Sequence, residues 1–155
     1  NLFAGRCDVY TTDASGLSST RAAAANPDKW VVLPEIISKE PLGPLVRHGD
    51  HQWGDVVRWS LNAMIIAEEL GVTSENVDAQ KSSNVPEVLR LLGVEGSYGE
   101  MLELAPDWAY QIIKQIGNYS ESYEANVGPD TPLEIARGLN ALWTQGGILY
   151  APPFR

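Results

Sequence analysis

One carboxylate near the start of the chain, Asp13, combines a chemically useful side chain with a position at the end of a predicted element. Residues 7–12 before it are rich in β-branched and aromatic side chains and favour a strand. Residues 15–25 after it are rich in alanine and favour a helix. Asp13 is therefore expected at the carboxyl end of a strand, where open α/β sheets bind ligands. An aspartate there can also cap the helix, and the two roles can coexist.

The other reactive side chains do not form a recognisable catalytic or metal-binding pattern. Cys7 is the only cysteine and lies within the predicted strand, so we interpret it as a small buried hydrophobe and not as a nucleophile. His48, Asp50 and His51 include metal-ligating types, but structural zinc sites use wider spacings and four ligands. Asp50 is better explained as a helix N-cap. The sequence therefore predicts no metal, no cofactor and no enzymatic activity.

Composition and charge limit the classes of partner. A chain of 155 residues with 44% hydrophobic and 20% charged residues is expected to fold around a sizeable core. The net charge is −9, and most of it falls in residues 51–155, which carry six basic and fourteen acidic side chains. Such a surface repels phosphate backbones, so we expect no nucleic-acid partner. No apolar run approaches the roughly 18 residues of a membrane span, and no signal-peptide pattern is present.

The elements that must position Asp13 change character along the chain. Up to residue 48 the pattern is β-α-β-β, with further strands expected at 30–33 and 42–47. Beyond it, apolar residues recur at helical spacing. Helices are expected at 51–70, 84–92, 106–117 and 119–127, with one more from 131 to 143 opened by the capping box Thr131-Pro132-Leu133-Glu134. The expected fold class is α/β, with a strand-rich first third and a helical C-terminal two-thirds.

Several separate motifs resemble one protein family. Gly5-Arg6-Cys7-Asp8, followed by an apolar pair and Asp13, resembles the second-lobe signature of periplasmic amino-acid-binding proteins, the receptors of ABC importers. Residues 33–47 resemble the return crossover between the lobes of that family. The segments 118–119, 126–128, 136–143 and 146–153 are similar to the C-terminal tail of its general L-amino-acid-binding subgroup. The resemblance covers nearly the whole chain, but only the C-terminal half of a full member.

The resemblance implies a fold, a function and a site. It implies part of a type II periplasmic-binding-protein fold. Residues 1–40 would end the second ligand-binding lobe, 41–48 would form the interlobe crossover, and 49–155 would be a helical C-terminal extension packing on the first lobe. The implied function is binding of L-amino acids in the periplasm for an ABC importer, whose membrane subunits would be partners.

The resemblance also implies which residues bind each part of the amino acid. The carboxylate at the Asp13 position takes the α-ammonium of the bound amino acid. Thr12 and Ser15 flank it and are candidates to add hydroxyls. The groups that hold the ligand's α-carboxylate match nothing in this chain, so we expect it to supply half of the site. Unpaired strand edges would then favour a homo-oligomer or a domain swap.

Two other functions remain open from the sequence. A cyclohexadienyl-dehydratase-like enzyme shares the same fold, but it would need an acid–base pair where only Asp13 is visible. Alternatively, the acidic helices of residues 51–145 would form an interaction module without any small ligand. Turnover of arogenate or prephenate would identify the enzyme, and tight amino-acid binding that depends on Asp13 would argue against the module.

Overall fold

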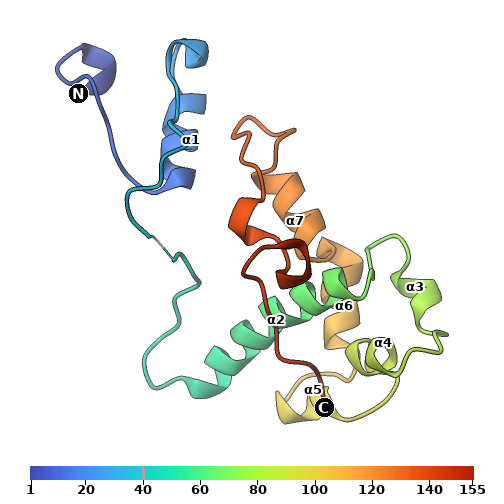
Figure 1. The fold of residues 1–155 in the computed structure, drawn as a ribbon. Coiled ribbons are helices and arrows are strands. Elements are labelled where there is room, and N and C mark those ends of the chain that lie inside the picture. Colours follow the sequence, from blue (N-terminus) through green and yellow to red (C-terminus); the bar gives the residue numbers. More distant parts are fainter. Residues whose placement is uncertain (40) are drawn as a thin grey trace. The chain divides into compact units, whose positions relative to one another are not determined.

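The computed structural model describes residues 1–39 and 41–155, and its regular structure is helical (Figure 1). Glu40, the last residue of the expected lobe segment 1–40, lies outside the described residues. The α-helices are α1 (Ala14–Ala22), α2 (His51–Glu69), α3 (Val77–Gln80), α4 (Pro86–Leu91), α5 (Tyr98–Met101), α6 (Trp108–Ile116) and α7 (Tyr119–Asn126). Short 3-10 turns occupy Leu2–Ala4, Pro27–Lys29, Gly138–Asn140 and Trp143–Gln145. None of the described helices is both long and apolar enough to cross a membrane.

The contacts within the chain define two compact units. The N-terminal unit comprises Asn1–Gly43 and Glu124–Ala136, and the helical unit comprises Pro44–Tyr123 and Arg137–Arg155. The expected division at 1–40, 41–48 and 49–155 refers to the lobes of a longer protein and stays a prediction.

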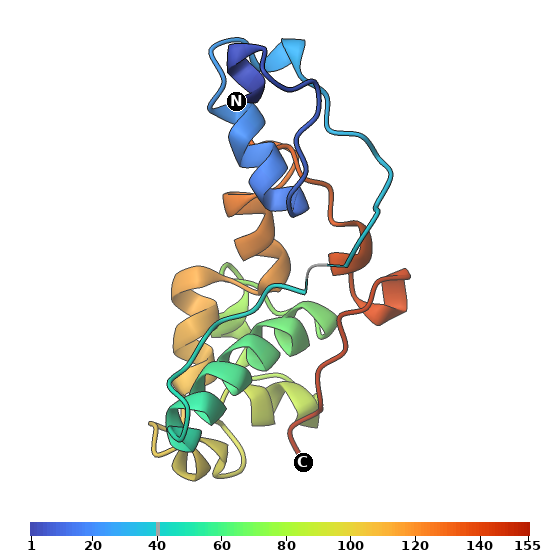
Figure 2. The same ribbon diagram turned by 90° about the vertical axis from the view of Figure 1, so that its left-hand side faces the viewer.

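The predicted helix at 51–70 is confirmed as α2, which forms the centre of the helical unit (Figure 2). The Asp50 side chain caps it by accepting the amide of Trp53 at 3.1 Å, as its sequence position predicts. Gly71, at a φ of +67°, follows the end of the helix in the left-handed region that favours glycine. Ala63 and Ala67 on α2 are fully buried, and α2 packs against α4 and α6. The helical periodicity therefore identified the helix but not its buried face, because the apolar residues Trp53 and Leu61 are 55% and 38% exposed.

Asn118 joins three segments of the helical unit. Its side-chain amide donates to the carbonyl of Val72 at 2.9 Å, and its side-chain oxygen accepts the amide of Glu121 at 3.0 Å. The Glu121 carboxylate in turn accepts the Asn118 amide at 2.8 Å and the Ser74 hydroxyl at 2.6 Å. This reciprocal arrangement satisfies amides at the start of α7 that otherwise have no helical partner.

Replacing Asn118 by alanine is expected to lower the free energy of unfolding by about 1–3 kcal/mol. The variant loses the helix cap and leaves the carbonyl of Val72 without this donor, in a site where Asn118 is 5% exposed. Urea denaturation followed by circular dichroism measures the change. Gln115→Ala, at an exposed position near the end of α6, is the control. Equal unfolding free energies for the two variants would contradict the proposed role of Asn118.

The prediction of a strand-rich first third is wrong for this structure. The described residues contain no paired strand, and the one isolated β-bridge joins Leu142 and Leu149. The segments 7–12, 30–33 and 42–47 have the composition of strands, but a strand exists only through hydrogen bonds to a neighbouring strand. Cys7 is correspondingly exposed and not buried as expected.

The helix expected over 131–143 is also absent. The Thr131 hydroxyl donates to the carbonyl of Gly128 and accepts the amide of Leu133, so it forms a turn instead of a helix cap. Glu134 has a φ of +52° and forms an ion pair with Arg21 of α1. Gly138, at a φ of +48°, interrupts the segment further. The capping-box residues therefore form turns in this structure and not the first turn of a helix.

Candidate ligand-binding site

The structure brings Asp13, Thr12 and Ser15 together at the start of α1. Asp13 is the N-cap of this helix and accepts the amide of Gly16 at 2.7 Å. Its carboxylate also accepts the hydroxyl of Ser15 at 2.5 Å and that of Thr12 at 3.2 Å. Asp13 is half-buried, so part of the carboxylate faces solvent. The helix-cap interpretation of Asp13 is therefore confirmed, whereas the ligand-binding roles of these residues remain predictions.

The hydrogen bonds determine which kind of ligand this cluster suits. Both hydroxyls use their protons on the Asp13 carboxylate, so the lone pairs of Ser15 and Thr12 remain to accept hydrogen bonds. The N-terminus of α1 is already capped by the Asp13 carboxylate, which occupies the position where an anionic ligand would bind. The cluster therefore presents acceptors and a negative charge, an arrangement that suits an ammonium group.

The Asp13 carboxyl is held in its ionised form. The Ser15 hydroxyl and, next, the Gly16 amide lower its pKa below the ordinary value of 3.8, partly offset by desolvation. Because the folded pKa lies below the unfolded one, the charged carboxylate stabilises the fold at pH values above the unfolded pKa. That contribution is lost as the pH falls through the lower, folded pKa. At neutral pH the site is therefore anionic.

Removing the Ser15 hydroxyl is expected to raise the pKa of Asp13. Ser15→Ala deletes the donor that contributes most to the lowering, whereas Thr12→Val deletes a weaker one and should raise the pKa less. A carbon-detected NMR titration of the Asp13 carboxyl from pH 2 to 7 measures both shifts. An unchanged midpoint in Ser15→Ala would mean that this hydroxyl does not donate to Asp13 in solution.

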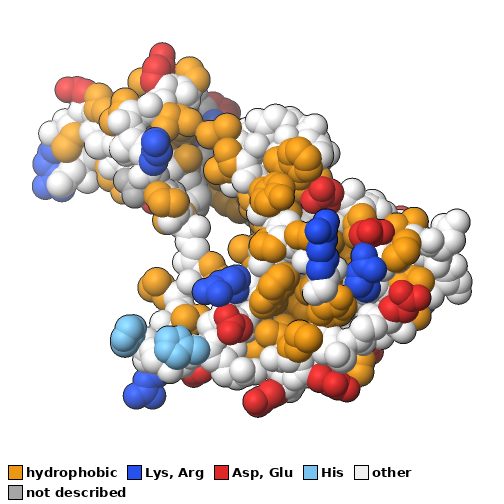
Figure 3. Space-filling model, turned by 60° about the horizontal axis from the view of Figure 1, so that its bottom comes forward, with side chains coloured by type: hydrophobic (Ala, Val, Ile, Leu, Met, Phe, Trp, Pro, Cys, Tyr) orange, Lys and Arg blue, Asp and Glu red, His pale blue; other side chains and the backbone are white. Residues whose placement is uncertain are grey.

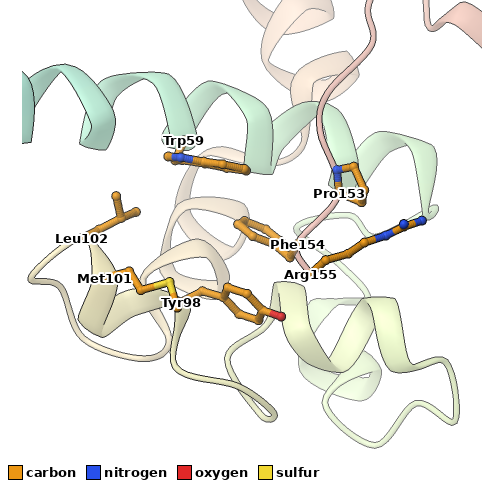
Figure 4. A pocket seen from close by; sticks show the side chains of 7 residues that line it. All are labelled: Trp59, Tyr98, Met101, Leu102, Pro153, Phe154 and Arg155. Atoms are coloured by element: carbon orange, nitrogen blue, oxygen red, sulfur yellow. The ribbon is translucent and has the colours of Figure 1, made fainter.

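The helical unit contains two hollows that the sequence did not predict. The first, of about 150 Å³, is lined by Trp59 of α2, Tyr98 and Met101 of α5, Leu102, and the tail residues Pro153, Phe154 and Arg155 (Figure 4). The second, of about 180 Å³, includes Glu69, Trp143 and Tyr150 in its lining. Figure 3 shows apolar side chains gathered on one face, with both acidic and basic side chains beside them. Each hollow combines segments distant in sequence, so no local pattern could have identified it.

No metal centre is found in the described part of the chain. His48 and His51 are both exposed near the start of α2, and Asp50 between them caps that helix. Among the described residues, no group of three or more histidine, cysteine, aspartate or glutamate side chains is placed to hold a metal ion.

Comparison with known proteins gives a consistent set of relatives. No protein-family model matches the chain. The glutamate/glutamine/aspartate/asparagine-binding protein BztA of Rhodobacter capsulatus is 58% identical over 98% of this chain and 45% of its own length. The general L-amino acid-binding periplasmic protein AapJ of Rhizobium johnstonii shows the same identity and coverages. The putative amino-acid ABC transporter-binding protein YhdW of Escherichia coli K12 is 56% identical over 99% of this chain and 46% of its own.

A solved structure agrees with these relatives. An ABC transporter periplasmic binding protein from Brucella ovis, with glutathione bound, is 54% identical and superposes with a TM-score of 0.94 over 99% of this chain and 48% of its own. The chain thus spans about half the length of the proteins it matches. The resemblance seen in the sequence is confirmed: over nearly all of its length, the chain is homologous to just under half of an amino-acid-binding protein of an ABC transporter.

Proposed function

We propose that this chain is part of the solute-binding component of an ABC importer and that it contributes the ammonium-binding half of an amino-acid site. The observation that carries the proposal is the cluster around Asp13, in which an ionised carboxylate and two hydroxyls all present acceptors. An α-ammonium offers three donors and a positive charge, so it complements this cluster. The names of the relatives support an amino-acid ligand and a periplasmic location.

The ligands named for the relatives share one chemical group, the α-amino-acid head group. Glutamate, glutamine, aspartate and asparagine each carry an α-ammonium and an α-carboxylate, and so does the γ-glutamyl end of glutathione. A site that recognises this head group tolerates different side chains, in agreement with the general L-amino-acid specificity in the name of AapJ. We therefore assign recognition of the α-ammonium to Asp13, with Ser15 and Thr12 as further acceptors.

The rest of the site belongs to the longer protein in this proposal. Asp13 accepts the amide of Gly16, so a negative charge already lies at the N-terminus of α1, where the ligand's α-carboxylate would otherwise bind. We propose that the chain is the C-terminal half of a type II periplasmic-binding fold and that a first lobe supplies the donors for that carboxylate. Closure of two lobes would then exclude water and strengthen the ammonium–carboxylate contact. The membrane subunits of the importer would receive the closed form.

The proposal involves binding without chemistry. In the described part of the chain, the side chains hydrogen-bonded to Asp13 are the hydroxyls of Thr12 and Ser15, and neither is an acid or base at neutral pH. A dehydratase-like mechanism would need a second titratable group in contact with the substrate. The geometry therefore supports a receptor better than an enzyme.

Calorimetric titration of a chimera tests this proposal. In the chimera, this chain replaces the matching segment of AapJ, so that both halves of the site are present. We expect one L-amino acid to bind per molecule, with intact AapJ as the positive control and the 155-residue chain alone as the half-site control. A folded chimera that binds none of the common L-amino acids or glutathione would contradict the proposal. Turnover of arogenate or prephenate would favour the enzyme.

A further inference from the structure

The second hollow of the helical unit, of about 180 Å³, places a carboxylate beside two exposed aromatic rings. Trp143 and Tyr150 are 50% and 68% exposed, and their rings meet edge-on with centroids 5.6 Å apart and an interplanar angle of 70°. The indole N–H of Trp143 donates to the carboxylate of Glu69 at 3.2 Å. Two aromatic rings and a carboxylate therefore border the same space, and all three belong to one folded unit.

Glu69 lacks the cation that its position favours. It is the last residue of α2, where the negative end of the helix dipole favours a basic side chain, yet the last turn of α2 contains none. The adjacent Glu68 is paired, because the Arg137 guanidinium donates to both of its carboxylate oxygens at 3.1 Å. Among the described residues, no basic side chain forms an ion pair with Glu69. This helix end therefore carries a negative charge that the described chain does not neutralise.

The other charged residue in the lining of the hollow is also acidic. Glu87 of α4 pairs with Arg90 at 3.2 Å, and Arg90 donates in addition to the carbonyl of Phe154, so its guanidinium is engaged by these two groups. In the described part of the chain, no basic side chain lines the hollow itself. The hollow therefore combines apolar, aromatic and acidic groups, and it complements a cation carried on an apolar stem.

The geometry of these groups favours a guanidinium over other cations. A guanidinium is planar, so it stacks on an aromatic face and donates two parallel hydrogen bonds to a carboxylate, whereas an ammonium is a strongly hydrated point charge. Free arginine is a poor match, because its α-carboxylate would approach Glu69 and Glu87 with no cation in the lining to pair with it. An arginine within a polypeptide has no such carboxylate. The chemistry of the lining therefore favours an arginine of another protein.

We propose that the second hollow binds an arginine side chain on the surface of a partner protein. The guanidinium stacks on the ring of Trp143 and donates to the carboxylate of Glu69, which supplies the cation that the end of α2 lacks. The charge of the surrounding chain supports this occupant, since residues 51–155 carry six basic and fourteen acidic side chains. The hollow belongs to a different unit from the Asp13 cluster, and the proposal does not depend on amino-acid binding.

NMR titration of the AapJ chimera with an acetylated and amidated Gly-Arg-Gly peptide tests the proposal. The blocked peptide has neither an α-ammonium nor an α-carboxylate, so it does not compete for the Asp13 cluster. The indole N–H signal of Trp143, identified by its loss in Trp143→Phe, reports on the hollow directly. We expect a saturable shift of this signal at millimolar peptide. The same peptide with citrulline, whose neutral ureido group replaces the guanidinium, is expected to bind about tenfold more weakly or less.

Two substitutions separate the contributions of charge and ring. Glu69→Gln removes the charge but keeps an oxygen for the Trp143 indole, and it should weaken peptide binding about tenfold or more. Trp143→Leu removes the stacking surface and should weaken binding by about 3- to 30-fold, measured from the backbone amide signal of Glu69. Glu75→Gln removes the same charge from an exposed position of the helical unit outside the hollow, so it should leave the affinity unchanged.

Three results would overturn the proposal. The first is the absence of a saturable shift of the Trp143 signal in the folded chimera. The second is equal affinity for the arginine and citrulline peptides, or an affinity that Glu69→Gln leaves unchanged. The third is a shift in the 155-residue chain but not in the chimera, which would mean that the rest of the binding protein covers the hollow. Failure of the chimera to bind amino acids would instead contradict the proposed function and leave this inference standing.

Discussion

Replacing Asp13 by asparagine in the chimera is expected to weaken binding of L-amino acids by about 30- to 3,000-fold. Removing one partner of a desolvated, hydrogen-bonded charge pair costs about 2–5 kcal/mol, and 1.4 kcal/mol corresponds to a factor of ten in affinity. Asparagine keeps the length of the side chain and is itself a good helix N-cap, so α1 should retain its start. Calorimetric titration of both proteins with the same amino acid gives the ratio of dissociation constants.

The chain supplies a matched control for this substitution. Asp50 is also an N-cap aspartate, and it accepts the amide of Trp53 as Asp13 accepts that of Gly16. Among the described residues, no side-chain hydroxyl donates to the Asp50 carboxylate, whereas those of Thr12 and Ser15 donate to Asp13. Asp50→Asn should therefore leave the affinity unchanged while removing the same charge. Equal affinities for the Asp13 and Asp50 variants would reduce Asp13 to a helix cap and remove the basis of the proposed function.

The comparison of Asp13 with Asp50 also shows what a sequence can establish about a site. Both aspartates were placed correctly as N-caps because capping depends on residues within one turn of the same chain. The proximity of Thr12 and Ser15 to Asp13 follows from the same local geometry. In the proposed function, the partner for the ligand's α-carboxylate comes from the rest of the binding protein, and no pattern within these residues predicts it.

The range of the stabilising contacts also explains which secondary-structure predictions were correct and which were wrong. Helices α2 and α6 carry continuous apolar stripes that bury against each other, so periodicity alone identified them. Residues 7–12 and 30–33 have strand composition, but no strand pairs with them among the described residues. The capping box at Thr131 forms a turn instead of a helix, and its Glu134 pairs with Arg21 of α1. Local signals therefore identified the helices that carry a repeated apolar pattern, and they failed for segments whose conformation depends on particular residues distant in sequence.

The tail residue Phe154 was not predicted to be part of the core, although it contacts three aromatic residues of the helical unit. It stacks on Trp59 of α2 at 5.3 Å and contacts Tyr98 of α5 at 5.4 Å (Figure 4). It also contacts Trp108 of α6 edge-on at 6.0 Å. Its carbonyl accepts a hydrogen bond from Arg90 of α4 at 3.1 Å. A single residue near the end of the chain therefore links four helices.

Replacing Phe154 by alanine is expected to lower the free energy of unfolding of the helical unit by about 3–5 kcal/mol. Phe154 is 8% exposed, so the substitution leaves a cavity between rings that pack against it. Urea denaturation followed by tryptophan fluorescence suits this measurement, because Trp59 and Trp108 both contact the deleted ring. Far-UV circular dichroism on the same samples verifies that the helices unfold in the same transition.

An aromatic residue of the same tail tests whether burial, and not loss of a ring as such, causes the effect. Tyr150 is 68% exposed and contacts Trp143 edge-on, so Tyr150→Ala should cost less than about 1 kcal/mol. Phe154→Leu keeps most of the apolar volume and should fall between the two. If Phe154→Ala unfolds at the same urea concentration as Tyr150→Ala, the tail is not packed into the helical unit in solution. Because the Phe154 ring is buried against three aromatic residues, we expect the segment that carries it to contribute to the stability of the helical unit.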